Sequence, residues 1–151
     1  MIAAIIDTVP SSWTDRATEV LRAAGYRGGG ARSTVIAYLA RQDCCLSAQE
    51  IFDGVRGERP VGIASIYRTL DLLLELRLVQ KVDLGGGTAR YERAAGYDHH
   101  HHVVCGDCGK VEPFSDERHE TAMDALAGTL GYELDAHDVV LRGACADCRA
   151  A

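Results

Sequence analysis

Two Cys-x-x-Cys pairs in the second half of the chain constrain its fold more than any other feature. The first pair is Cys105 and Cys108, and the second is Cys145 and Cys148. Four thiolates make a tetrahedral Zn²⁺ site that has no open position. Because 36 residues separate the pairs, a small domain must fold back between them to bring the sulfurs together. The spacing predicts a structural zinc site coupled to folding, and a redox dithiol is the alternative.

A run of four histidines, His99 to His102, lies just before the first cysteine pair. Its flanking residues favour a β-strand, in which successive side chains point to opposite faces of the sheet. His100 and His102 would then share one face, and His99 and His101 the other. One strand would supply imidazole ligands to two metal sites. The alternatives are a polar loop without a metal role and a purification tag, although a tag normally lies at a terminus.

Charge is distributed unevenly along the 151 residues. Residues 1–82 hold ten basic and nine acidic side chains, whereas residues 83–151 hold six and 13, which together give the net charge of −6. This asymmetry predicts two modules, of which only the first can approach phosphates without strong repulsion. The apolar start of the chain lacks a basic segment and is too short to span a bilayer. We therefore expect a cytoplasmic protein without a membrane partner, where cysteine pairs commonly bind metal.

The first half has the pattern of a helical module followed by a β-hairpin. Apolar residues at helical spacing predict helices at 11–24, 32–42, 47–56 and 63–77, the third opened by a capping box of Ser47 and Glu50. Alternating residues predict strands at 78–84 and 88–93, with three glycines in the turn between them. Three helices closed by a hairpin describe a winged helix-turn-helix, in which residues 63–77 form the recognition helix.

The predicted recognition helix carries polar side chains near its N-terminus, where such helices meet base edges and phosphates. They are Ser65, Tyr67, Arg68 and Thr69. The triple glycine at 28–30 suggests a flexible arm that lays Arg27 toward the DNA backbone or a minor groove. The alternative is an ordinary half-exposed helix face with no ligand.

The second half mixes helix and strand. Residues 116–130 have a helical pattern, and residues 132–134 and 139–141 look like strands that could pair across a two-fold axis. The fold class is therefore α+β, with a winged-helix DNA-binding domain at 1–93, a hinge at 94–97, and a metal-binding dimerisation domain at 98–151. We expect the dimerisation domain to be a small α/β unit with a three-stranded sheet.

From about Gly25 to Cys148, the chain resembles the ferric uptake regulator family of metal-dependent repressors. The shared motifs are Gly25-Tyr26-Arg27 with Arg32, residues 46–50, residues 62–70, Tyr91-Glu92, the histidine run and both cysteine pairs. The resemblance implies a homodimeric repressor that binds palindromic double-stranded DNA and has no small organic substrate. The resemblance also implies that Arg32 contacts DNA, in addition to Arg27 and the residues of the recognition helix.

Two further metal sites are implied by the same resemblance, carried over residue by residue. The regulatory site falls on Cys45, Glu92, His100 and His102. The second site, in the dimerisation domain, falls on His99, His101, Glu120 and His137. His119 matches no ligand of the family, so we expect it at the surface.

Ligand identities differ from the family pattern at three positions. Cys45 stands where the family often has histidine, His101 where it often has aspartate, and Pro113 where iron- and peroxide-sensing members often have a carboxylate. The loss of possible oxygen ligands and the gain of a thiolate favour zinc as the sensed metal, with iron as the main alternative and manganese, nickel or peroxide sensing behind it. Ala94 stands where zinc-sensing relatives often have cysteine, which argues against zinc. Cys45 has the further alternative of a buried small hydrophobe.

Two other classes of function compete with a repressor. A zinc hydrolase or deaminase needs three protein ligands, an open coordination position and a general base. Every predicted site here has four protein ligands, so we expect no enzyme and no catalytic residue. A zinc-stabilised protein-interaction adaptor would share the four-cysteine site but would need no recognition helix.

Overall fold

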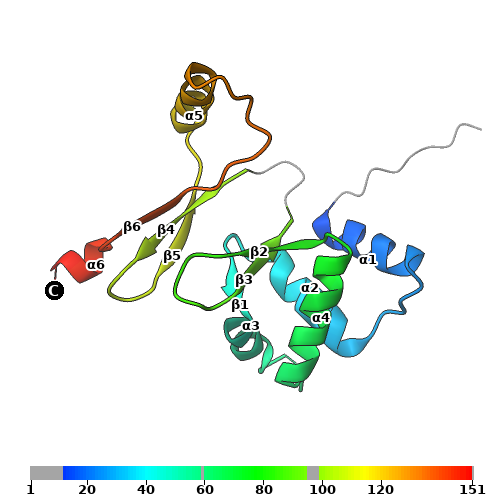
Figure 1. Cartoon of the computed structure of the whole chain (residues 1–151). Coiled ribbons are helices and arrows are strands. Elements are labelled where there is room, and N and C mark those ends of the chain that lie inside the picture. Colours follow the sequence, from blue (N-terminus) through cyan, green and yellow to red (C-terminus); the bar gives the residue numbers. More distant parts are fainter. Residues whose placement is uncertain (1–11, 59, 95–98, 151) are drawn as a thin grey trace, which may run out of the picture. The chain divides into compact units, whose positions relative to one another are not determined.

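The computed structural model describes residues 12–58, 60–94 and 99–150, which belong to two compact units (Figure 1). Unit 1 comprises Met1–Val82 and Ala89–Ala94, and unit 2 comprises Asp83–Thr88 and Ala95–Ala151. Residues 95–97 of the expected hinge lie outside the described residues, as do residues 1–11. Within the described part of the chain, no helix is long and apolar enough to cross a membrane.

Unit 1 has the predicted order of helices followed by a hairpin. Its helices are α1 (Trp13–Ala23), α2 (Gly30–Ala40), α3 (Ala48–Val55) and α4 (Ile63–Glu75). Its antiparallel sheet has the order β1-β3-β2, made of β1 (Leu46–Ser47), β2 (Val79–Val82) and β3 (Arg90–Arg93). Strand β1 escapes sequence reasoning because two residues are too few to show alternation. Unit 1 is thus a winged helix-turn-helix.

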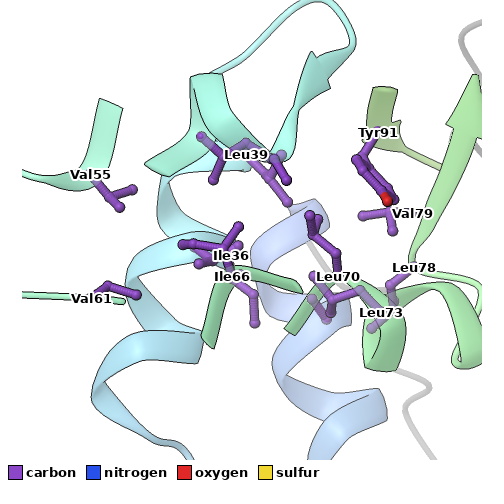
Figure 2. Packing of buried hydrophobic residues seen from close by; sticks show 14 of the residues in the cluster. Ile36, Leu39, Val55, Val61, Ile66, Leu70, Leu73, Leu78, Val79 and Tyr91 are labelled. Atoms are coloured by element: carbon purple, nitrogen blue, oxygen red, sulfur yellow. The ribbon is translucent and has the colours of Figure 1, made fainter. Parts of the chain in front are cut away.

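The core of unit 1 lies between its helices and its sheet (Figure 2). Ile66, Leu70 and Leu73 recur at helical spacing along α4 and are completely buried. Tyr91 and Val79 of the sheet belong to the same apolar cluster. Each large aliphatic side chain buried in this way contributes roughly 1.5–3 kcal/mol, so the cluster stabilises unit 1 without a metal.

The capping box predicted at the start of α3 is confirmed. The Ser47 hydroxyl accepts a hydrogen bond from the Glu50 backbone N–H (3.2 Å), and the Glu50 carboxylate accepts one from the Ser47 N–H (2.7 Å). We expect Ser47→Ala to lower the free energy of unfolding by about 1 kcal/mol, because it leaves a helix N–H without its partner. Urea denaturation would measure this loss. Ser33→Ala, on the exposed face of α2, is the matched control, and equal effects of the two changes would contradict the prediction.

Unit 2 is a three-stranded sheet with two helices. Strands β4 (His101–Cys105), β5 (Val111–Phe114) and β6 (Val140–Gly143) have the order β5-β4-β6. Strand β4 is antiparallel to β5 and parallel to β6. Helix α5 (Glu117–Thr129) lies between β5 and β6 in sequence, and α6 (Ala146–Ala150) follows β6. The central strand therefore carries the end of the histidine run and the first cysteine.

The strand predicted at residues 132–134 is wrong. Gly131 has a φ of +82°, and the Tyr132 N–H donates to the carbonyl of Ala127, 2.9 Å away. Such a left-handed residue with a backward hydrogen bond is a common helix ending, so this backbone closes α5 and does not extend a sheet. Strand β5 and helix α6 were not predicted.

Unit 2 has a much smaller hydrophobic core than unit 1. Among the described residues, its only buried hydrophobic side chains are Leu84, Cys105 and Ala127. A domain with so little buried apolar surface generally needs a metal, a disulfide or a partner chain to stay folded.

Candidate functional site

The four cysteines predicted to bind structural zinc lie together in unit 2. Their Sγ atoms are all within 4.8 Å of one another, and those of Cys108 and Cys145 are 3.8 Å apart. Tetrahedral coordination with Zn–S bonds of about 2.3 Å would place its sulfurs about 3.8 Å apart. The parallel pairing of Cys105 in β4 with Gly143 in β6 explains how the two pairs meet. The donor set and its spacing both fit zinc.

Backbone N–H groups prepare one of these cysteines as a ligand. Hydrogen bonds from the N–H groups of Cys108, Cys145 and Asp107 lower the pKa of the Cys105 thiol to about 6. The Cys145 N–H donates to Cys105 Sγ over 3.3 Å. Hydrogen bonds among the cysteine side chains raise the pKa of Cys148 to about 12. Cys105 is therefore a thiolate at neutral pH before any metal arrives, whereas Cys148 must release a proton to bind one.

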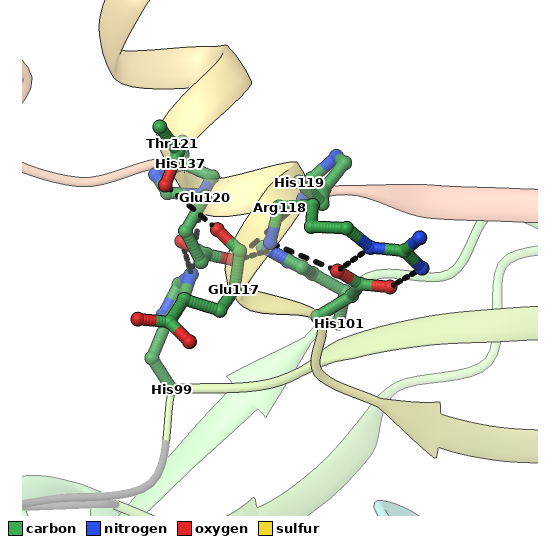
Figure 3. A network of polar contacts seen from close by, with 9 residues as sticks. His99, His101, Glu117, Arg118, His119, Glu120, Thr121 and His137 are labelled. Carbon is green, nitrogen blue, oxygen red and sulfur yellow. Dashed lines mark hydrogen bonds and ion pairs between the residues drawn. The ribbon is translucent and has the colours of Figure 1, made fainter.

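A second cluster of donors in unit 2 consists of the residues predicted for the second metal site (Figure 3). His99, His101, Glu120 and His137 each offer a ligand atom within 4.8 Å of the others. The Nε2 atoms of His99 and His137 are 3.3 Å apart. Tetrahedral zinc with Zn–N bonds of about 2.0–2.1 Å would hold two imidazole nitrogens at about this separation.

Glu120 holds this cluster together through hydrogen bonds. Its Oε1 lies 2.8 Å from Nε2 of His101, and its Oε2 lies 3.0 Å from Nε2 of His137. Burial lowers the pKa of His101, which is 1% exposed, although the neighbouring Glu120 opposes this shift. Burial would raise the pKa of Glu120, but the hydrogen bond with His101 and the nearby imidazole of His119 bring it below its ordinary value. These shifts favour a neutral imidazole at His101 and an ionised carboxylate at Glu120, the forms that ligate metals.

His119, which we expected at the surface, is only partly exposed (29% of its side chain) and faces Glu120. Its Nδ1 lies 3.6 Å from Oε1 of Glu120, and its ring centroid is 4.9 Å from that of His101 in an edge-to-face arrangement. Nδ1 is shielded from solvent and has no hydrogen-bond partner among the described residues. Its place beside Glu120 in the first turn of α5 was the sequence signal that could have found it.

The histidine run has the predicted alternation. The rings of His99 and His101 lie 4.6 Å apart, and those of His100 and His102 lie 5.0 Å apart. Strand β4 begins only at His101, so His99 and His100 precede the ladder. The run therefore divides into two pairs, of which the odd-numbered pair joins the Glu120 cluster.

Two residues of the predicted regulatory site, Cys45 and Glu92, are neighbours in unit 1. Strand β1 pairs Leu46 with Tyr91 of β3, which places the preceding residue Cys45 next to Glu92. Cys45 is 1% exposed, and Glu92 accepts a hydrogen bond from Gln80 (2.6 Å). A hydrogen bond with Cys44, together with burial and the nearby charges of Cys44 and Glu92, raises the pKa of the Cys45 thiol. Cys44 was not among the predicted site residues, although its position next to Cys45 in the sequence could have identified it. His100 and His102 belong to unit 2, so the four-residue set stays a prediction.

Helix α4 exposes most of the residues predicted to meet DNA. Tyr67 is 49% exposed, Arg68 is exposed, and its Nη2 donates to the Ser65 hydroxyl over 3.0 Å. Thr69 is less accessible than the other predicted contacts, because it is buried and its hydroxyl donates to the Ser65 carbonyl (2.8 Å), and its role at DNA stays a prediction. The helical turn points position 69 toward the core beside Leu70 and Leu73.

Two residues of the predicted glycine-rich arm belong to the start of α2. Gly29 is the N-cap of α2 and Gly30 its first residue, so the helix begins two residues before the predicted start. Arg32 donates to the carbonyl of Arg27 (2.8 Å), and its guanidinium lies 5.3 Å from the centre of the Tyr26 ring. Arg32 thus braces this segment, while Arg27 itself is exposed.

Comparisons with known proteins all identify the same family. The model of the family "Ferric uptake regulator family" matches residues 23–142. The ferric uptake regulation protein of Bacillus subtilis (strain 168) is 33% identical over 138 residues, covering 89% of this chain and 93% of that protein. A Helicobacter pylori ferric uptake regulator structure, described as revealing three functional metal binding sites, has a TM-score of 0.79 at 27% identity and covers 93% of this chain and 94% of its own. A Pseudomonas aeruginosa ferric uptake regulator with manganese has a TM-score of 0.65 at 28% identity, covering 85% and 96%.

Proposed function

Since this chain belongs to the ferric uptake regulator family, we propose that it is a zinc-responsive repressor that binds palindromic operator DNA as a homodimer. The family consists of metal-responsive, DNA-binding transcription regulators and not of enzymes. Membership of this family also argues against an interaction adaptor that does not bind DNA. The sensed metal and the assembly are the parts that we propose here.

One observation carries the choice of zinc, namely the chemistry of the clustered donors. They are four thiols in one group, three imidazoles with a single carboxylate in another, and the buried Cys45 thiol beside Glu92 among the residues of the predicted regulatory site. Sulfur and imidazole ligands in groups of four suit zinc, whereas iron and manganese sites in proteins take more oxygen ligands. The B. subtilis relative is named for ferric uptake and the P. aeruginosa structure contains manganese, so the proposal of zinc rests on the donors of this chain.

Three metal sites follow from this proposal. Cys105, Cys108, Cys145 and Cys148 would hold structural zinc, and His99, His101, Glu120 and His137 would hold a second zinc. Cys45, Glu92, His100 and His102 would form the regulatory site. Iron at the regulatory site is the alternative.

The homodimer is supported by exposed hydrophobic side chains in unit 2. Four of them are 49–71% exposed: Leu126, Leu130, Tyr132 and Leu141. A unit with so few buried hydrophobic residues would gain stability by covering such side chains with a second copy of itself. A two-fold dimer presents two copies of α4, which suits half-sites about one helical turn apart.

Regulation would come from the ligands that the two units contribute. A metal held by Cys45 and Glu92 of unit 1 and by His100 and His102 of unit 2 limits how one unit turns against the other. We propose that the orientation of the two units in the metal-bound protein is the one that binds DNA. The metal binds this DNA-binding state more tightly than the other states, and it therefore shifts the protein population toward that state.

Selection from a random DNA library tests this function without knowledge of the operator. We expect purified full-length protein with excess Zn²⁺ to enrich sequences with an inverted repeat. Weak chelation that leaves the four-cysteine zinc in place should abolish the enrichment. Enrichment with Fe²⁺ but not with Zn²⁺ would replace zinc by iron, and no enrichment with any metal would contradict the proposal.

Arg68 on α4 provides the matched variant for this experiment. We expect Arg68→Ala to weaken binding to the selected repeat by about 1–3 kcal/mol if it reads a base, and to leave metal content unchanged. Arg56→Ala, on α3's C-terminal side, serves as a control for general loss of positive charge. Equal losses from both changes would argue that α4 does not read the DNA.

A further inference from the structure

We propose that His119 is a positioning residue of the second metal site, in which its Nδ1–H holds Oε1 of Glu120 and leaves only Oε2 to ligate the metal. The inference rests on the proposed second site, which His119 was not predicted to join. Its role would be to set how many oxygen atoms the site offers.

The imidazole of His119 has an unused hydrogen-bonding atom beside the carboxylate. Nδ1 is shielded from solvent, has no hydrogen-bond partner among the described residues, and lies 3.6 Å from Oε1 of Glu120. The ring lies edge-to-face against Phe114, with centroids 6.1 Å apart, and against His101 at 4.9 Å. Buried polar atoms are normally satisfied, so an imidazole nitrogen held at this distance from a carboxylate indicates a contact that closes in another state of the site, with the proton on Nδ1.

Metal binding would create that state by redirecting the other imidazoles. Without metal, His101 lies 2.8 Å from Oε1, and His137 lies 3.0 Å from Oε2. An imidazole nitrogen that ligates a metal uses its lone pair and no longer donates a hydrogen bond. Oε1 would thus lose its contact with His101, and His119 is the remaining imidazole on that side of the carboxylate.

Helix α5 is built to keep His119 and Glu120 in step. The backbone N–H groups of both residues donate to the carbonyl of Asp116, over 2.9 and 3.1 Å. Asp116 caps the helix and its carboxylate also binds the Arg118 guanidinium, at 2.7 and 3.1 Å. Adjacent residues in one anchored turn can maintain a fixed distance between an imidazole and a carboxylate.

His119 is less suited to be a fifth ligand. The clustered donor atoms belong to His99, His101, Glu120 and His137, and His119 is not part of that group. Its ring centroid is 6.4 Å from that of His137, and its Nδ1 lies 3.6 Å from the carboxylate of Glu120. Hydrogen-bonded partners of ligating groups commonly orient them in this way.

The contact between His119 and Glu120 would affect which metal the second site prefers. Three imidazoles with one carboxylate oxygen make a four-coordinate set, which is the geometry of zinc. A carboxylate released from His119 could bind through both oxygens and raise the donor count to five. More oxygen donors favour Mn²⁺ relative to Zn²⁺. His119 would therefore bias the second site toward zinc.

Metal affinities of His119 variants test this role. The parent is full-length protein carrying Cys45→Ser and His100→Ala, which removes the predicted regulatory site while the four-cysteine zinc stays bound. Competition with a chromogenic chelator would give Kd values for Zn²⁺ and Mn²⁺ in the parent, in His119→Phe and in His119→Asn. Phenylalanine keeps the ring without Nδ1, whereas the asparagine Nδ2–H lies close to the position of Nδ1–H. Circular dichroism would check the fold of each variant.

We expect His119→Phe to weaken zinc binding about 10- to 100-fold and manganese binding much less, so that the ratio of the two affinities falls. His119→Asn should restore most of that ratio. Equal losses for both metals, or a ratio that asparagine fails to restore, would overturn the positioning role. Two other results would instead overturn the second site itself: a parent protein that binds no second zinc, or one that still binds it after His137→Ala. Both results can be observed without any change at His119.

Discussion

Replacing Cys148 with serine is expected to remove the zinc of the four-cysteine site and to unfold the sheet of unit 2. The reason is the small hydrophobic core of that unit, which has only Leu84, Cys105 and Ala127 as buried hydrophobic residues in the described part of the chain. Structural zinc sites contribute apparent free energies of about 10–16 kcal/mol to the folding of small domains. Unit 1 has its own core around Ile66, Leu70 and Leu73 and should remain folded.

The location of the four cysteines explains why one replacement has such a large effect. Cys105 ends β4, Cys108 lies in the following turn, and Cys145 and Cys148 lie just before and within α6. Zinc bound there links the central strand to the segment after β6. Cys105 is preformed as a thiolate by three backbone N–H groups, and a site with three thiolates left would hold zinc more weakly and in an open geometry.

Metal analysis and limited proteolysis would measure this outcome. We expect Cys148→Ser to retain less than one equivalent of zinc after dialysis against a chelator, and protease to digest unit 2 while unit 1 survives. Cys44→Ser is the control, because Cys44 belongs to unit 1 and lies outside the four-cysteine group. A variant with a full equivalent of zinc and an intact unit 2 would show that this site does not stabilise the fold.

Replacing Cys45 with serine, alone or with His100→Ala, is expected to abolish the metal dependence of DNA binding. The chemical reason lies in the state of the thiol without metal. Hydrogen bonding to Cys44, burial and nearby charges raise the pKa of Cys45, so it is protonated at neutral pH. Metal must displace this proton, and affinity at the regulatory site should therefore weaken as the pH falls. A serine hydroxyl does not ionise near neutral pH and supplies no thiolate.

Fluorescence anisotropy with a selected inverted repeat would measure this effect across a zinc titration. We expect the ratio of DNA affinities with and without zinc to approach about one in the variants, because a metal that does not distinguish two states cannot shift them. The four-cysteine zinc should remain bound. Cys44→Ala tests whether the neighbouring thiol is needed and is expected to retain the response. An unchanged zinc response in Cys45→Ser with His100→Ala would contradict the proposed regulatory site.

Local sequence patterns were sufficient for the elements whose stability depends on near neighbours. The capping box of Ser47 and Glu50 joins residues three apart, and the alternation of His99 with His101 needs only one extended segment. Helix α4 was predicted from apolar spacing, with its first residue Ile63 correct. The strand expected at 132–134 failed because the left-handed Gly131 directs the backbone back onto α5.

The sequence by itself therefore determined the four helices and the hairpin of the winged helix, and the types of ligand that the chain can offer. Only the tertiary structure decided which of those ligands meet. Pairing of β1 with β3 sets Cys45 beside Glu92, and the parallel pairing of β4 with β6 lets the two cysteine pairs converge. The first turn of α5 carries His119 against Glu120, and the packing of α4 turns Thr69 inward. Such contacts join residues that are distant in sequence or depend on which helix face is buried, so they follow from strand register and packing, which local patterns do not specify.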